Sequence, residues 1–198
     1  TTAAAVTALA AMPAQAQDSA PATPAVTMPA AIPSTTVDPA VATYYALRPG
    51  AQVWFRDADT RTAAMKLPSI LKRAAADGLD EGAALATQVE AATARGQPAD
   101  EQIISDAWVR YVRALQRPVD GISYGDPALE MKPQTAEKIL IAASRAPSLS
   151  QFVDQTSAVN PFYAALRDDA EKSGTLDDPR VRDTLNRLRL IPGTGRAI

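Results

Sequence analysis

Three Asp-Pro or Asn-Pro pairs stand directly before segments with apolar residues at helical spacing, and this pairing constrains the fold more than any other feature. The pairs are Asp38-Pro39, Asn160-Pro161 and Asp178-Pro179. Asp and Asn side chains accept hydrogen bonds from the free N–H groups of a first helical turn. Proline suits the first helical position because its missing N–H would have no partner there. Each pair therefore predicts the start of a helix.

Apolar side chains recur at helical spacing through most of the chain after residue 37. The widest apolar stripe follows Ala99-Asp100 and includes Ile104, Trp108 and Tyr111, so we expect a helix at the centre of the core over residues 99–115. The other helices are expected near residues 38–48, 67–78, 80–94, 135–144, 148–157, 160–170 and 178–188. The predicted fold class is all-α, an irregular bundle of about seven to eight short helices.

Details of four segments can also be predicted. Pro68 is expected near the start of its helix and Gly78 at its C-cap. The helix after Asn160 is expected to carry Phe162, Leu166 and Ala170. Residues 51–55 are short, apolar and aromatic, which favours an extended strand over a buried connector. Residues 119–131, with two glycines and a proline, predict an irregular loop.

The first 36 residues do not resemble a folded domain. Residues 1–12 are Ala-rich and uncharged, and Ala14-x-Ala16 fits a signal-peptidase site, so residues 1–16 are expected to be a signal-peptide remnant. The alternative is a low-complexity tail. Residues 17–36 are rich in Ala and Pro with almost no charge, which predicts a disordered linker. Residues 37–198, about 160 residues, are enough for one domain with its own core. An exported chain of this kind is expected in the periplasm.

The chain contains no cysteine and no histidine. This excludes thiol nucleophiles, imidazole bases, disulfides and the commonest zinc, copper and haem ligands. The simplest interpretation is that these residues catalyse nothing. We therefore predict no catalytic, cofactor-binding or metal-binding residue, and no cofactor.

The charge pattern argues against nucleic acid as a partner. The net charge is −2, whereas nucleic-acid binders usually present a concentrated basic face. The one basic concentration, opposed only by Asp183, is at the C-terminal end and is interpreted as a solvated helix face plus a domain junction: Arg180, Arg182, Arg187, Arg189 and Arg196. No stretch is long and apolar enough to predict a transmembrane segment.

Carboxylates remain as the possible acid and base of an enzyme. A glutamate in an apolar setting can serve as a general acid, as in all-α muramidases. The candidates are expected on exposed helix faces, with Glu101 in a first turn: Glu81, Glu90, Glu101, Glu130, Glu137 and Glu171.

Ser105 and Ser150 have no partner base, so neither is a credible nucleophile, and Asp168-Asp169 and Asp177-Asp178 are interpreted as caps and solvated charge. Trp108 and Tyr111 are expected in the core, whereas Trp54 is the better candidate for a partial surface role.

Several short motifs occur in a definite order along the chain. Residues 41–45 are followed by Val53-Trp54-Phe55, and residues 71–79 have the pattern L-x-x-A-x-x-x-G-L. Residues 104–111 contain a Ser-Asp-Ala sequence and a following tyrosine, and residues 161–166 have the pattern P-x-Y-x-x-L. In this order the motifs, together with residues 186–192, resemble the helical scaffold region of the large class of periplasmic murein L,D-transpeptidases. Residues 186–192 resemble the stretch that leads into the catalytic domain of that family.

The resemblance implies a scaffold that positions a catalytic domain near peptidoglycan. In that family the catalytic domain supplies the cysteine nucleophile and the histidine base, so neither role can be assigned to a residue here. We therefore expect a partial copy whose partners are a C-terminal catalytic domain after residue 198 and peptidoglycan. A complete but inactive protein is the alternative for the chain itself. Two further functions stay open: a free-standing peptidoglycan-binding or adaptor module, and a glycosidase that uses carboxylates.

Overall fold

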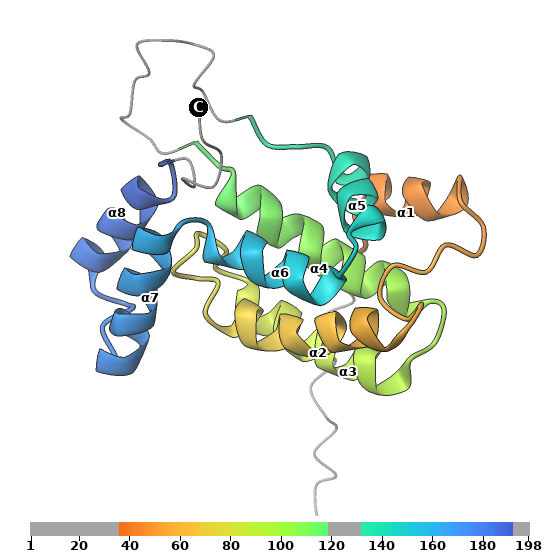
Figure 1. Ribbon diagram of the computed structural model, residues 1–198, viewed down its shortest axis with the longest axis horizontal. Helices are drawn as coiled ribbons and strands as arrows, with labels where there is room; N and C mark the ends of the chain where they lie inside the picture. Colours follow the sequence, from red (N-terminus) through yellow and green to blue (C-terminus); the bar gives the residue numbers. More distant parts are fainter. Residues whose placement is uncertain (1–35, 119–131, 192–198) are drawn as a thin grey trace, which may run out of the picture. The chain divides into compact units, whose positions relative to one another are not determined.

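A computed structural model describes residues 36–118 and 132–191 (Figure 1). These residues form eight α-helices and no strand, so the predicted all-α fold is confirmed. The helices are α1 (Pro39–Ala46), α2 (Ala58–Lys72), α3 (Gly82–Arg95), α4 (Asp100–Leu115), α5 (Ala136–Arg145), α6 (Leu149–Ala158), α7 (Pro161–Ser173) and α8 (Pro179–Leu188). The predicted signal-peptide remnant, all but the last residue of the predicted linker and the predicted loop over residues 119–131 lie outside the described residues.

The predicted helix caps are present. The carboxylate of Asp38 accepts a hydrogen bond from Ala40 N, and Asp178 accepts one from Arg180 N. The side-chain oxygen of Asn160 accepts one from the backbone N–H of Tyr163. Proline occupies the first helical position in α1, α7 and α8. Local cap chemistry was therefore sufficient to place these three helix starts.

Helix α2 differs from the prediction at both ends. It begins at Ala58, because Asp57 and Thr60 form a capping box in which each side chain accepts a hydrogen bond from the backbone N–H of the other residue. Pro68 therefore lies inside the helix and not near its start. The helix ends at Lys72, and the chain then passes through turns to Gly78, which has a positive φ of +88° and is not the C-cap.

Helices α2, α3 and α4 pack together, with α4 at the centre of the core. Trp108 of α4 is fully buried and forms aromatic contacts with Trp54, Tyr111 and Phe152 at centroid distances of 6.1, 5.9 and 6.2 Å. Aromatic pairs at this spacing add to the free energy of burial. The prediction that Trp108 and Tyr111 belong to the core is confirmed.

The approach of α3 to α2 requires a glycine. A Cβ atom at Gly82 would lie 2.9 Å from Ala74 Cβ and would also collide with the carbonyl oxygen of Leu71. Contacts this short are essentially absent from real structures, so a larger side chain at position 82 would push the two helices apart. The small residue thus allows the close packing of α2 and α3.

Residues 51–57 form an irregular connector with bends, not the predicted strand. Val53 is 1% exposed and Trp54 is fully buried, so this connector is part of the core. The prediction of a partial surface role for Trp54 is wrong. The apolar, aromatic sequence of residues 51–55 indicates burial, but this composition is typical of both strands and buried loops.

Helices α7 and α8 lie side by side and share a small core of their own, which consists of Ala76, Tyr163 and Leu185 (Figure 1). The inward residues of α7 are Tyr163, Arg167 and Ala170, whereas Phe162 is 66% exposed. The predicted face of α7 was therefore wrong by one residue at Phe162. In the part of the chain that is described, no helix combines the length and the apolar character needed to cross a membrane.

Candidate functional site: buried carboxylates that join distant segments

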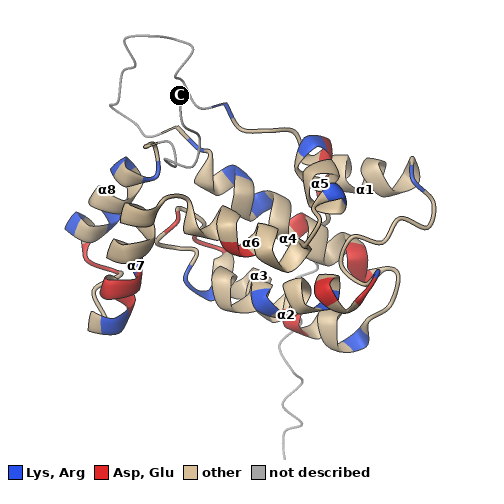
Figure 2. Cartoon of the chain, viewed as in Figure 1, with Lys and Arg blue, Asp and Glu red and all other residues tan. Residues whose placement is uncertain are grey.

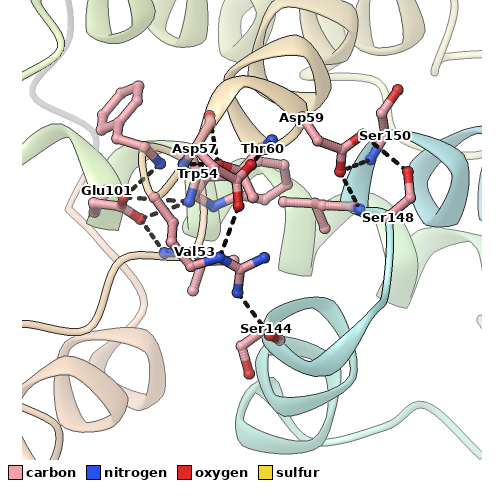
Figure 3. A network of polar contacts seen from close by, with 12 residues as sticks. Val53, Trp54, Asp57, Asp59, Thr60, Glu101, Ser144, Ser148 and Ser150 are labelled. Carbon is pink, nitrogen blue, oxygen red and sulfur yellow. Dashed lines mark hydrogen bonds and ion pairs between the residues drawn. The ribbon is translucent and has the colours of Figure 1, made fainter.

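Glu101 lies at the centre of a polar network that holds the connector between α1 and α2 (Figure 3). Its carboxylate accepts hydrogen bonds from three successive backbone N–H groups, those of Val53 at 2.9 Å, Trp54 at 3.1 Å and Phe55 at 2.9 Å. Glu101 is 1% exposed. The sequence placed it correctly in the first turn of α4, but the expected exposed helix face is wrong. Three backbone donors stabilise a carboxylate that would otherwise be costly to bury.

Ser105, one turn further along α4, extends this network. Its hydroxyl lies 2.7 Å from the Tyr45 hydroxyl and accepts a hydrogen bond from Trp54 Nε1 at 2.9 Å. The Tyr45 hydroxyl also donates to the Glu101 carboxylate at 3.2 Å. Burial raises the pKa of Tyr45, and the hydrogen bond with Ser105 only partly opposes that effect. Ser105 therefore acts as a structural link between α1, α4 and the connector.

The start of α1 is attached to α4 by a second buried carboxylate. Asp106 is 2% exposed and accepts hydrogen bonds from Asp38 N at 2.8 Å and Arg110 Nε at 2.8 Å. The Asp38 carboxylate in turn pairs with Arg113 at 2.7 Å. The hydrogen bond from Ala40 N is the largest cause of the lowered pKa of Asp38, and Arg113 adds to it. The cap that starts α1 thus also fixes its position on α4.

Asp59 of α2 caps a different helix (Figure 3). Its carboxylate accepts hydrogen bonds from Leu149 N at 2.6 Å, Ser150 N at 3.3 Å and the Ser148 hydroxyl at 2.9 Å. The bond from Ser148 is the largest cause of the lowered pKa of Asp59. These donors lie at the start of α6, so a side chain of α2 helps to cap the N-terminus of α6. Nearby, Arg56 Nη1 donates to Ser144 O at 3.1 Å and satisfies a carbonyl at the end of α5.

Asp77 forms a buried polar contact between the main core and the α7–α8 pair. It is completely buried and accepts hydrogen bonds from the hydroxyls of Tyr111, at 2.9 Å, and Tyr163. Arg167 lies 3.8 Å from the carboxylate and donates to Ser157 O at 2.6 Å. Burial raises the pKa of Asp77, while Tyr163 and Arg167 oppose that rise. Burial also raises the pKa values of both tyrosines, so they remain donors.

Sequence reasoning did not single out Asp77. The residue stands in a turn-like Ala-Ala-Asp-Gly segment, which is typical of an exposed loop. Tyr111 and Tyr163 were noted only as parts of separate helix motifs. Nothing in the local pattern indicates that residues 34 and 86 positions away donate to the same carboxylate.

Basic residues recur along α8 (Figure 2), and some of them make structural contacts whereas others are exposed. Arg189 is buried and donates to the carbonyl oxygen of Ala114, so it attaches the end of α8 to the end of α4. Arg182 forms an ion pair with Asp80 at 3.3 Å and donates to Ala75 O. The expectation that Asp183 alone opposes these basic residues is therefore wrong. Arg180 and Arg187 are exposed, as expected of a solvated face. Arg196 is outside the described residues.

The other acidic candidates that the structure describes lie on the surface. Four glutamates are exposed and face a basic side chain: Glu81 with Arg110, Glu90 with Lys72, Glu137 with Arg48 and Glu171 with Arg73. Glu130 lies outside the described residues. Asp168, Asp169, Asp177 and Asp178 are exposed, and Asp178 is a cap. Within residues 36–118 and 132–191 no group of three acidic side chains could hold a metal ion.

The oxygen atoms of these carboxylates, buried at Glu101 and Asp77 and partly exposed at Asp59, accept hydrogen bonds from the protein's own donors. Glu101 and Asp59 bind backbone N–H groups, and Asp77 binds two hydroxyls beside a guanidinium. Each carboxylate joins segments that are far apart in the sequence. Their arrangement is suited to holding helices in fixed positions, because such contacts have narrow geometric limits.

A family model described as Scaffold domain matches residues 39–169, about two thirds of the chain. The match begins at the first residue of α1 and ends within α7, so it includes the Glu101 and Asp77 networks. No curated protein and no solved structure matches the chain.

Proposed function

We propose, since this chain belongs to the Scaffold domain family, that its helical part is the support of a periplasmic murein L,D-transpeptidase. The observation that carries this proposal is the family match over residues 39–169. The ordered motifs that resemble the transpeptidase scaffold, several of which fall in the same range, refine it. In this proposal the support positions a catalytic module that forms cross-links in peptidoglycan.

The chemistry of acyl transfer through a thiol belongs, in this proposal, to the catalytic module. Such transfer needs a thiolate nucleophile and a base, and this chain contains neither cysteine nor histidine. The buried carboxylates Asp77 and Glu101 are each bound by several donors of the chain itself. Both are almost completely buried, so a substrate would not reach their oxygen atoms.

The contacts of α7 and α8 supply a physical means of positioning. Tyr163 and Arg167 bind or face Asp77, and Arg189 donates to the last turn of α4. Asn160 Nδ2 donates to Leu188 O at 2.8 Å and to Ile191 O at 3.1 Å. Residues up to 191 are thus attached to the core by several independent hydrogen bonds. Packed interiors deform little, so a module that follows this segment would keep a defined position.

The gene provides a direct test of the assignment. We expect the reading frame that encodes this chain to contain, beyond codon 198, a segment with a histidine and a Ser-x-Gly-Cys sequence. A frame that ends without such a segment would remove the transpeptidase assignment and leave only the scaffold fold.

Positioning can be tested in the natural gene product. Tyr163→Ala removes a donor of the Asp77 cluster, and we expect it to reduce L,D-cross-links measured by mass spectrometry of digested cell walls. Phe162→Ala, at the exposed neighbouring position, is the matched control and should leave the cross-links unchanged. Equal cross-linking by both variants would contradict a positioning role for α7.

Binding to sacculi separates this proposal from a free-standing binding module. The purified chain should show little retention on isolated sacculi, because positioning does not require its own affinity for peptidoglycan. Strong retention would favour the autonomous module.

For location, we propose the periplasm, and we expect cell fractionation to find the mature protein there with its N-terminus just after Ala16.

A further inference from the structure

An open cleft lies where the end of α5 meets the start of α6. Its volume is about 280 Å³ and its walls include Arg145, Pro147, Gln151, Phe152 and Gln155. Pockets for drug-sized ligands usually measure about 300–1,000 Å³. The cleft therefore has room for a small ligand only, such as one or two residues with short side chains.

Arg145 is the one charged residue in the wall of this cleft. Its side chain is exposed, and within the described ranges no hydrogen bond or ion pair of its guanidinium is formed. The basic neighbour Arg56, by contrast, pairs with Asp57 and donates to Ser144 O. A guanidinium offers two parallel N–H donors that match the two oxygen atoms of a carboxylate. The cleft thus presents an available cation of the right shape for a carboxylate group.

Gln151 and Gln155 stand four residues apart on one face of α6, so their amides are neighbours. Each amide has donors and an acceptor, which can pair with the N–H and C=O of a peptide group. Phe152 adds apolar surface to the cleft, and its ring packs against that of Trp108 at a centroid distance of 6.2 Å. Pro147 adds apolar surface at the helix junction.

The start of α6 is not itself the binding group. Its first N–H groups are satisfied by Asp59 and by the Ser148 hydroxyl, which accepts from Gln151 N at 3.1 Å. An anion at this cleft would therefore depend on Arg145 and not on free backbone donors.

We infer that this cleft binds the carboxylate end of a short peptide with small side chains. Arg145 pairs with the terminal carboxylate, the two glutamines bind the last peptide group, and Phe152 contacts the side chains. This site goes beyond the proposed function, because neither the framework nor the positioning of a catalytic module needs it.

The test titrates the whole ¹⁵N-labelled chain with N-acetyl-alanyl-alanine and follows the backbone and side-chain NMR signals. We expect saturable shifts of Arg145, Gln151 and Gln155. The C-terminal amide of the same peptide should bind about tenfold more weakly, since a charge-assisted hydrogen bond is lost. Arg145→Ala should weaken binding of the acid by a similar factor, and Arg145→Lys should lie between, because lysine keeps the charge but loses the paired donors.

Arg180→Ala, an exposed arginine on α8, is the control and should bind as the unmodified chain does. The inference is overturned by equal binding of acid and amide, by equal binding of acetate and peptide, by shifts that fall outside α5 and α6, or by unchanged binding in Arg145→Ala. Arg145 is exposed, so its replacement leaves the core intact and the result can be interpreted. The assay contains no cell wall and no catalytic module, so its failure is distinct from failure of the proposed function.

Discussion

Glu101 at the start of α4 accepts a hydrogen bond from the backbone N–H of Trp54, which precedes it by 47 residues, at 3.1 Å. The same carboxylate also binds the N–H groups on either side of that residue. A loop with no strand partner thereby satisfies its backbone donors inside the core. The tryptophan side chain can then pack against Trp108.

Glu101→Ala should be among the most destabilising changes in the chain. It leaves two buried backbone donors, at Val53 and Trp54, and a partly buried one at Phe55 without an acceptor. Each buried donor costs about 1–3 kcal/mol, so we expect a loss of at least ~2 kcal/mol. Urea unfolding followed by circular dichroism measures this. Glu90→Gln removes only an exposed pair with Lys72 and should cost less than about 1 kcal/mol. Similar midpoints for the two variants would refute the role of Glu101.

The pKa of Asp77 should lie above 3.8 in the folded protein, because burial disfavours its charged form. Its contribution to stability is then complete below pH 3.8 and is lost as the pH rises through the folded pKa. Asp38 and Asp59 have lowered pKa values, so their contributions are lost as the pH falls. Carboxyl ¹³C NMR during a pH titration measures all three. A midpoint for Asp77 below those of Asp38 and Asp59 would contradict this ordering.

Ser148→Ala should cost about 1 kcal/mol, the usual value for loss of an N-cap side chain. Its hydroxyl accepts from Gln151 N and donates to Asp59, so the loss weakens both the start of α6 and its contact with α2. Thermal unfolding is the measurement. Ser69→Ala, which removes an exposed hydroxyl bonded only to Lys66 O within α2, should stay within about 0.5 kcal/mol of the unmodified chain.

Truncation of Tyr163 should destabilise the fold far more than truncation of its neighbour Phe162. Tyr163→Ala removes a fully buried ring and a donor to Asp77, so we expect a loss of about 3–5 kcal/mol. Tyr163→Phe keeps the ring and should lose about 1–3 kcal/mol. Phe162→Ala removes a ring that is 66% exposed, and its stability should change by no more than about 0.5 kcal/mol. Chemical unfolding of the three variants would show whether the inward face of α7 begins at Tyr163.

The starts of α1, α7 and α8 could be predicted because each depends on contacts within three residues. Asp38, Asn160 and Asp178 cap the helix that they precede. The start of α2 depended on an equally local capping box at Asp57 and Thr60. The presence of Pro68 suggested a later start, but proline within a helix costs only one hydrogen bond and some local strain when packing compensates.

Sequence alone determined that these residues form helices and that Trp108 and Tyr111 lie in the core, because periodicity and cap chemistry act within one or two turns. Only the tertiary structure decided which acidic residues are buried. Glu101 and Asp77 are buried because hydrogen-bond donors 34 to 86 residues away in the sequence reach their carboxylates. A carboxylate can enter the interior only where distant donors converge on it, and that convergence is a property of the packed helices.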